Sequence, residues 1–211
     1  MDFELSHQQQ ALKQMVHDFA RREVAPVAEE LDRTGRFPYE IVEKLGKLGL
    51  LGLPFPEKYG GGGADTISYV IAIEELARVD SSVGATMMAS ISLGGTPLYL
   101  FGTEEQKERW LRPLAEGKRL GAFGLTEPGA GSDAGATATT ARLDGDEWVI
   151  NGTQGFINNA GTDISGFVII TAATGEQGGK KQISNIVVPR GTPGYTYGPH
   201  YSKLGWRAAD T

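Results

Sequence analysis

The period of the hydrophobic pattern changes once along this chain, near residue 118, and this change limits the possible folds more than any other feature. Before it, apolar residues recur every three or four positions, as on one face of an α-helix. After Leu120, short runs rich in Thr, Val and Ile alternate with Gly and Asp, as in antiparallel strands. The sequence therefore predicts an α+β protein: an all-helical domain over residues 1–118, then an incomplete antiparallel β domain over residues 119–211.

Start signals divide the first domain into helices. The capping box formed by Ser6 and Gln9 predicts a helix N-terminus. Pro38 suits the first turn of a second helix, and Asp65 suits the N-cap of a third. We expect the apolar faces of these two helices to be Ile41, Leu45 and Leu48 in the former and Val70, Ile71, Ile73 and Leu76 in the latter.

One stretch, residues 81–103, carries no charge and is long enough to span a bilayer. It contains Gly94-Gly95 and Pro97, and only about half of its residues are apolar, so its transfer into lipid would be unfavourable. We interpret it as a buried core helix, opened by Ser81 or Ser82, followed by a turn.

The second domain offers short candidate strands bounded by turn residues, at 136–143, 147–154, 166–173, 182–189 and 195–201. Asp144-Gly145 between the first two favours a hairpin, and the polar, glycine-rich residues 175–181 are expected to form a connection. The last residues, KLGWRAADT, offer neither a closing strand nor a helix cap. We therefore expect the sheet domain to continue beyond this chain.

Composition excludes several classes of function. A formal net charge of −6 provides no basic surface for nucleic acid or an anionic membrane. The chain has no cysteine, which excludes disulfides, thiolate metal sites and cysteine nucleophiles, and its three histidines do not cluster, so no metal site is expected. The segment MDFELSHQQQ lacks the features of a signal or transit peptide, which predicts a cytoplasmic protein with small-molecule or protein partners.

Glycine-rich loops are the first candidates for chemistry. Residues 129–134 fit the dinucleotide pattern G-x-G-x-x-A, but a Thr-rich strand rather than a helix follows them, so a Rossmann site is not predicted. The wider segment from Phe123 to Asp133 runs from a strand into a loop of small residues. Small residues let backbone N–H groups approach a polar ligand, and Thr126 and Ser132 add donors. Composition alone is equally compatible with a binding site and with an ordinary turn at a sheet edge.

Several motifs, in order along the chain, resemble the acyl-CoA dehydrogenase family. They are PEKYGGGGAD at 56–65, GTEEQKERWLRPLAEGK at 102–118, GLTEPGAGSDAGA at 124–136, INGTQGFINNAG at 150–161 and KLGWRAADT at 203–211. Members of this family have an N-terminal helical domain, a middle β domain and a C-terminal four-helix domain. The resemblance implies that this chain covers the first domain and most of the second. It implies that the third, which carries the glutamate base of the family, is absent.

Carried over by position, the resemblance implies contacts with FAD for Phe123, Leu125, Thr126, Gly131, Ser132, Phe156, Ile157 and Asn158. Ser132 would also touch the acyl-CoA. Asn158 stands where the family usually has Thr or Ser at the flavin N5 edge. Two alternatives follow: the Asn158 carboxamide donates a hydrogen bond to the flavin, or the side chain turns away and only the main-chain N–H meets the flavin. The helix around residues 90–95 would help to line the acyl cavity, although core packing is the expected role of its individual residues.

The implied reaction is the α,β-dehydrogenation of an acyl-CoA thioester to the trans-2-enoyl-CoA, in fatty acid or amino acid degradation. Electron-transfer flavoprotein would take the electrons, and the full-length protein would be a homo-oligomer, a tetramer or dimer. No residue is assigned as catalytic base, since Glu127, followed by Pro128, is expected to fix its loop, so this chain alone should be inactive. Two alternatives remain: a flavin oxidase of the same fold, of the acyl-CoA oxidase or nitroalkane oxidase type, and a non-catalytic ligand-binding module.

Overall fold

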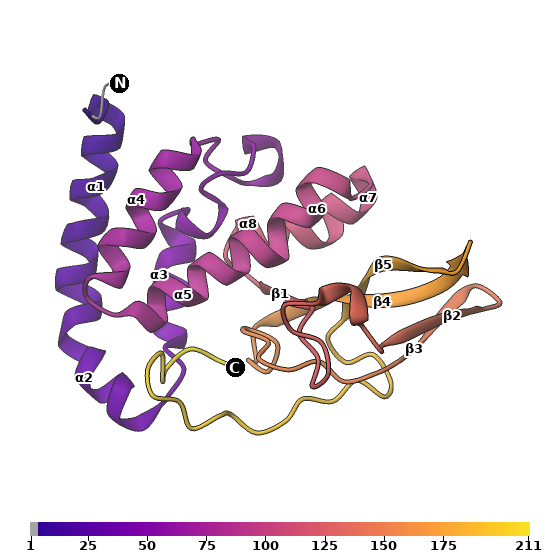
Figure 1. Cartoon of the computed structure of the whole chain (residues 1–211). Helices are drawn as coiled ribbons and strands as arrows, with labels where there is room; N and C mark the ends of the chain where they lie inside the picture. Colours follow the sequence, from indigo (N-terminus) through magenta and orange to yellow (C-terminus); the bar gives the residue numbers. More distant parts are fainter. Residues whose placement is uncertain (1–3) are drawn as a thin grey trace.

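The computed structural model describes residues 4–211, with helices in the first half of the chain and a sheet in the second (Figure 1). The π-helical turns η1 (Ala20–Val24), η4 (Ala89–Gly95) and η5 (Lys107–Leu111) join successive α-helices. The α-helices are α1 (His7–Phe19), α2 (Ala25–Thr34), α3 (Tyr39–Lys47), α4 (Thr66–Ala77), α5 (Ser81–Met88), α6 (Thr96–Phe101), α7 (Glu104–Gln106) and α8 (Arg112–Ala115). The order of a helical domain followed by a sheet domain is as predicted.

The predicted helix starts are confirmed. The Ser6 hydroxyl accepts from the Gln9 N–H at 3.2 Å, and the Gln9 side chain accepts from the Ser6 N–H at 3.0 Å, which completes the capping box of α1. Asp65 caps α4 by accepting from the Ser68 N–H at 2.7 Å, and Pro38 stands immediately before α3. These side chains satisfy N–H groups that have no partner inside the helix.

Two of the predicted core positions are wrong. Leu48 is 45% exposed, because α3 ends at Lys47 and Leu48 lies just beyond the helix. Val70 is 54% exposed, because it lies off the buried stripe of α4. That stripe follows helical spacing through Ser68, Ile71, Ala72, Glu75 and Leu76.

The uncharged stretch forms one continuous helix from Ser81 to Phe101, built from α5, η4 and α6 (Figure 1). The chain leaves this helix at Gly102 and Thr103, immediately before α7. At the end of η4 the Thr96 N–H donates to the carbonyl of Ile91, five residues back. This wide turn lets the helix continue past Pro97, which has no N–H of its own. Across residues 4–211, no helix combines the length and apolar character needed to cross a membrane.

The sheet is mixed, not antiparallel as predicted. It contains β1 (Leu120–Gly124), β2 (Thr140–Asp144), β3 (Glu147–Asn151), β4 (Ser165–Gln177) and β5 (Lys180–Pro189). Antiparallel ladders join β2 to β3 and β4 to β5, whereas β1 runs parallel to β4, and β2 meets β4 in parallel at Thr140 and Ala173. The difference arises because β1 and β4 are linked by a long connection that contains the β2–β3 hairpin, rather than by a tight turn.

Strand boundaries also differ from the sequence expectations. The first predicted strand begins only at Thr140, because residues 134–136 form a 3₁₀ turn, and residues 195–201 form no strand. The predicted Asp144-Gly145 hairpin is confirmed. Most of the connection expected at 175–181 belongs to β4 and β5, which need only the turn residues Gly178 and Gly179, with φ of +60° and +74°.

Close contact between η4 and β1 holds the sheet against the helices. A Cβ added to Gly94 would lie 2.7 Å from the Cα of Gly121, so neither position has room for a side chain. The buried Ser90 hydroxyl accepts from the Gly121 N–H at 3.3 Å. Ser90, Ile91, Gly94 and Gly95 therefore pack in the core, the role expected for such residues individually, whereas Leu93 is 44% exposed. This packing holds β1 against the helices.

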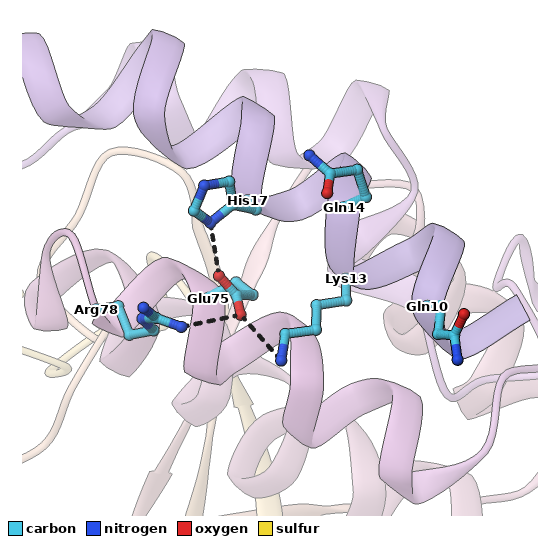
Figure 2. A pocket seen from close by; sticks show the side chains of 6 residues that line it. All are labelled: Gln10, Lys13, Gln14, His17, Glu75 and Arg78. Atoms are coloured by element: carbon cyan, nitrogen blue, oxygen red, sulfur yellow. Dashed lines mark hydrogen bonds and ion pairs between the residues drawn. The ribbon is translucent and has the colours of Figure 1, made fainter. Parts of the chain in front are cut away.

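Glu75 links α4 to α1 (Figure 2). Its side chain is only 1% exposed, and its carboxylate lies 3.0 Å from His17 Nδ1, 3.8 Å from Lys13 Nζ and 3.5 Å from Arg78 Nη1. His17 and Lys13 both belong to α1. The carboxylate thus joins two helices through polar contacts at the edge of their apolar interface.

We expect Glu75→Gln to lower the free energy of unfolding by about 1–3 kcal/mol, because a buried carboxylate would lose charge-assisted hydrogen bonds. Urea unfolding followed by circular dichroism measures this change. The control is Glu43→Gln, which removes an exposed ion pair with Lys47 and should cost less than about 0.5 kcal/mol. Equal effects of the two substitutions would contradict the linking role of Glu75.

Candidate functional site

Glu127 fixes the loop that follows β1. Its buried carboxylate accepts from the N–H groups of Ala138 at 2.7 Å and Thr139 at 3.0 Å, and from the Thr137 hydroxyl. The Gln154 side chain donates to it at 3.2 Å. Burial alone would raise the pKa of Glu127, but the hydrogen bonds from Thr137, Thr139 and Ala138 outweigh that effect and hold its pKa at about 2. Glu127 is therefore an ionised acceptor that organises the loop, as predicted.

The segment after β3 joins this loop. The Gly155 N–H donates to the Thr126 carbonyl at 2.7 Å, and this bond adds to that between Gln154 and Glu127. Two apolar side chains stay accessible on the joined segments: Leu125 is 36% exposed and Phe156 is 70% exposed. Phe156 also has a φ of +59°, which is uncommon for a bulky residue and costs backbone strain. The strained backbone and the exposed ring of Phe156 mark this surface as a candidate binding site.

The other predicted residues lie on or near the same two segments. Gly131 and Ser132 are exposed in the loop after β1, where Glu127 and Ala130 exchange two backbone hydrogen bonds. A Cβ added to Gly131 would meet nothing within 4 Å, so the loop is open on that side. Phe123 lies in β1 and packs partly against the core. The hydrogen bonds that join the two segments run from Gly155 to Thr126 and from Gln154 to Glu127.

Residues 200–211 form a third segment of the site, which the sequence did not place here. This third segment lies against Asn158. The Thr211 hydroxyl donates to Asn158 Oδ1 at 3.2 Å, and Lys203 Nζ donates to the Thr211 hydroxyl at 2.9 Å. The rings of Tyr201 and Phe156 have centroids 5.4 Å apart. The motif KLGWRAADT was the one signal of this segment, and its contacts with Asn158 and Phe156 follow from tertiary structure alone.

Asp210 anchors the third segment. It is 4% exposed, accepts from the Gly161 N–H at 2.7 Å and lies 3.0 Å from His200 Nδ1. Its main-chain carbonyl accepts from the Asn159 N–H at 3.3 Å, and the fully buried Asn159 side chain donates to the Thr86 carbonyl in α5. Figure 1 shows the corresponding path, in which the end of the chain returns beneath the sheet toward the helices. The segment is thus tied to both domains.

The surface suits a flat ring system that carries polar groups. Leu125 and Phe156 offer apolar contact, and the glycines of the loop after β1 leave open space beside the loop. Hydrogen-bonding groups are offered by Thr126, Ser132 and Asn158. Among residues 4–211, no group of three or more His, Cys, Asp or Glu side chains is placed to hold a metal ion.

Two family models match the chain almost from end to end. Residues 6–118 match the N-terminal domain of acyl-CoA dehydrogenase, and residues 122–211 match the middle domain. The chain belongs to the acyl-CoA dehydrogenase family. The resemblance recognised in its motifs is confirmed.

Acyl-CoA dehydrogenases of known sequence are similar over the whole chain. This chain is 53% identical to a probable acyl-CoA dehydrogenase of Bacillus subtilis and 46% identical to a short-chain specific acyl-CoA dehydrogenase of Clostridium acetobutylicum. Each match covers 100% of this chain. The chain spans 55% of the length of each of these relatives.

Solved structures show the same fold. Butyryl-CoA dehydrogenase from Megasphaera elsdenii matches with a TM-score of 0.93 at 42% identity, over 100% of this chain and 55% of that one. A structure described as the electron transferring flavoprotein of Acidaminococcus fermentans matches with a TM-score of 0.94 at 42% identity, over 100% of this chain and 55% of that one. Glutaryl-CoA dehydrogenase from Mycobacterium smegmatis in complex with FADH2 matches with a TM-score of 0.90 at 33% identity, over 98% of this chain and 51% of that one. The acyl-CoA dehydrogenase fold therefore includes the mixed sheet seen here.

Proposed function

We propose that this chain forms the N-terminal and middle domains of an FAD-dependent acyl-CoA dehydrogenase, which converts an acyl-CoA thioester to the trans-2-enoyl-CoA. The observation that carries the proposal is the open surface formed where the Gly155 N–H donates to the Thr126 carbonyl, with Leu125 and Phe156 exposed beside that bond, in a chain of this family. The Mycobacterium smegmatis relative in complex with FADH2 supports a flavin as the ligand.

In this proposal the chain binds and orients FAD, which when bound supplies a hydride acceptor. Leu125 and Phe156 contact the ring system, and the exposed loop at Gly131 gives the ligand a close approach to the backbone. Ser132, at the outer side of this loop, would contact the acyl-CoA. The full set that we assign to FAD is Phe123, Leu125, Thr126, Gly131, Ser132, Phe156, Ile157 and Asn158.

Proton removal is not assigned to the described part of the chain. A general base works best when its pKa lies near the operating pH. The pKa of Glu127 is about 2, and its oxygens are already engaged by Thr137, Ala138 and Thr139. Residues 4–211 therefore supply binding and orientation in this proposal, and the base comes from elsewhere.

Two protein partners are part of the proposal. Electron-transfer flavoprotein would take the electrons, a partner suggested by the likeness to the Acidaminococcus fermentans structure. The third segment also exposes large apolar side chains, including Leu204, Trp206 and Tyr201 at 105%, 48% and 51%. Clustered exposed apolar residues are typical of protein contact sites. We assign this surface to contacts within a homo-oligomer.

Fluorescence titration with FAD tests the proposed function. We expect the 211-residue chain to bind FAD weakly enough to lose it on gel filtration, because a ligand on one open wall recovers little of its association cost. Phe156→Ala should weaken binding about tenfold through the lost ring contact. Phe101→Ala, which removes another exposed ring, on α6, is the control and should leave binding unchanged. Absence of binding at about 1 mM FAD would contradict the proposal.

A further inference from the structure

The Asn158 carboxamide accepts a hydrogen bond from Thr211, and Lys203 in turn orients the Thr211 hydroxyl. Lys203 Nζ donates to the Thr211 hydroxyl oxygen at 2.9 Å and also to the Ala209 carbonyl. An ammonium group has donors and no acceptor, so the Thr211 oxygen must accept from it, and the single hydroxyl proton must point elsewhere. That proton goes to Asn158 Oδ1, at 3.2 Å. The carbonyl end of the amide therefore faces Thr211, and its NH₂ end points away.

The surroundings keep this relay in place. The side chains of Lys203, Thr211 and Asn158 are half-buried, which limits competition from water. Asn159 follows directly, is completely buried and has a φ of +66°, so the backbone beside Asn158 is fixed. Asp210 holds the other side of the relay through its hydrogen bond from the Gly161 N–H.

We propose that Lys203 and Thr211 are positioning residues that turn the NH₂ group of Asn158 toward the bound flavin. The inference rests on the proposed function. A carboxamide offers a donor at one end and an acceptor at the other, so its contact with an acceptor nitrogen of the ring depends on which end faces it. With the ends exchanged, two lone pairs would face each other, and a favourable hydrogen bond would become an unsatisfied one. An Asn at this position therefore needs the relay.

NMR with FAD labelled with ¹⁵N at N5 tests the inference on the 211-residue chain at saturating FAD. We expect the N5 resonance to shift on binding to the wild type, and the shift to be lost in Thr211→Val and Lys203→Met. Affinity should fall by no more than about tenfold, since at most one hydrogen bond is lost. Thr211→Ser keeps the hydroxyl and should restore the shift. Thr34→Val, which removes a hydroxyl that donates to the Glu30 carbonyl in α2, is the matched control and should behave as wild type.

The flavin-free chain gives a second measurement. The Asn158 NH₂ resonance, identified by its loss in Asn158→Ala, is expected to move in Thr211→Val and Lys203→Met and to stay in Thr34→Val. A Thr211→Val chain with the wild-type N5 shift would overturn the inference, as would a wild-type N5 resonance that does not move although FAD binds. Failure of the wild type to bind FAD at all would instead overturn the proposed function, and the inference with it.

Discussion

No turnover of acyl-CoA is expected from the 211-residue chain purified alone, even with excess FAD and a dye acceptor. The proposed reaction would remove a proton from the α-carbon of a thioester, which is a weak acid and requires a base of matched pKa. Glu127, the buried carboxylate of the candidate site, has a pKa of about 2 and is occupied by hydrogen bonds from residues 137–139. General acid–base catalysis contributes about 10² to 10⁴ in rate, so the loss should be at least that large.

Steady-state dye bleaching with acyl-CoA thioesters of several chain lengths measures this loss. Free FAD without protein sets the background rate. Sustained turnover above that background would show that a base is present among these residues, and Asp133→Asn and Glu127→Gln would then identify it. Asp133 is the exposed carboxylate of the same loop, so the two substitutions separate an accessible candidate from the buried one.

Glu127→Ala is expected to lower the free energy of unfolding by about 2–5 kcal/mol. Removal of the carboxylate leaves the buried Thr139 N–H and the buried Thr137 hydroxyl without their acceptor, and each unsatisfied buried donor costs about 1–3 kcal/mol. Glu127→Gln keeps one oxygen and should cost less, about 1–2 kcal/mol. Asp133→Ala, in the same loop, should stay within about 0.5 kcal/mol of wild type. Urea unfolding of the three variants measures these changes in the free energy of unfolding. A Glu127→Ala chain as stable as Asp133→Ala would refute the role assigned to Glu127.

The same carboxylate predicts a dependence of stability on acid. The folded-state pKa of Glu127, about 2, lies below the ordinary value of about 4.3. Its contribution to stability is therefore complete above the unfolded-state pKa and is lost as the pH falls through the folded-state value. The stability of the wild type should decline between about pH 5 and pH 2, and Glu127→Gln should lack this part of the decline. Identical pH profiles for both chains would contradict the assigned hydrogen bonds.

Local sequence signals predicted the elements of this fold where short-range physics decides them. The caps at Ser6 and Asp65 and the Asp144-Gly145 hairpin depend on contacts a few residues apart, and all three are found. Hydrophobic periodicity located α3 and α4 but misplaced Leu48 and Val70, because period alone does not say where a helix ends or which edge of its stripe meets the core. The motifs identified the family, since ordered matches at several positions are specific even without a structure.

Tertiary structure decided what depends on residues far apart in the chain. The parallel pairing of β1 with β4 has no local signal, because a strand's sequence does not state the direction of its neighbour. The same holds for the pairing of Gly155 with Thr126 and for the relay from Lys203 through Thr211 to Asn158. The sequence by itself determined the family, the two kinds of secondary structure and the loop around Glu127. Only the packed chain, which alone brings distant hydrogen-bonding groups within 3 Å or so of one another, determined how that loop is completed and how Asn158 is oriented.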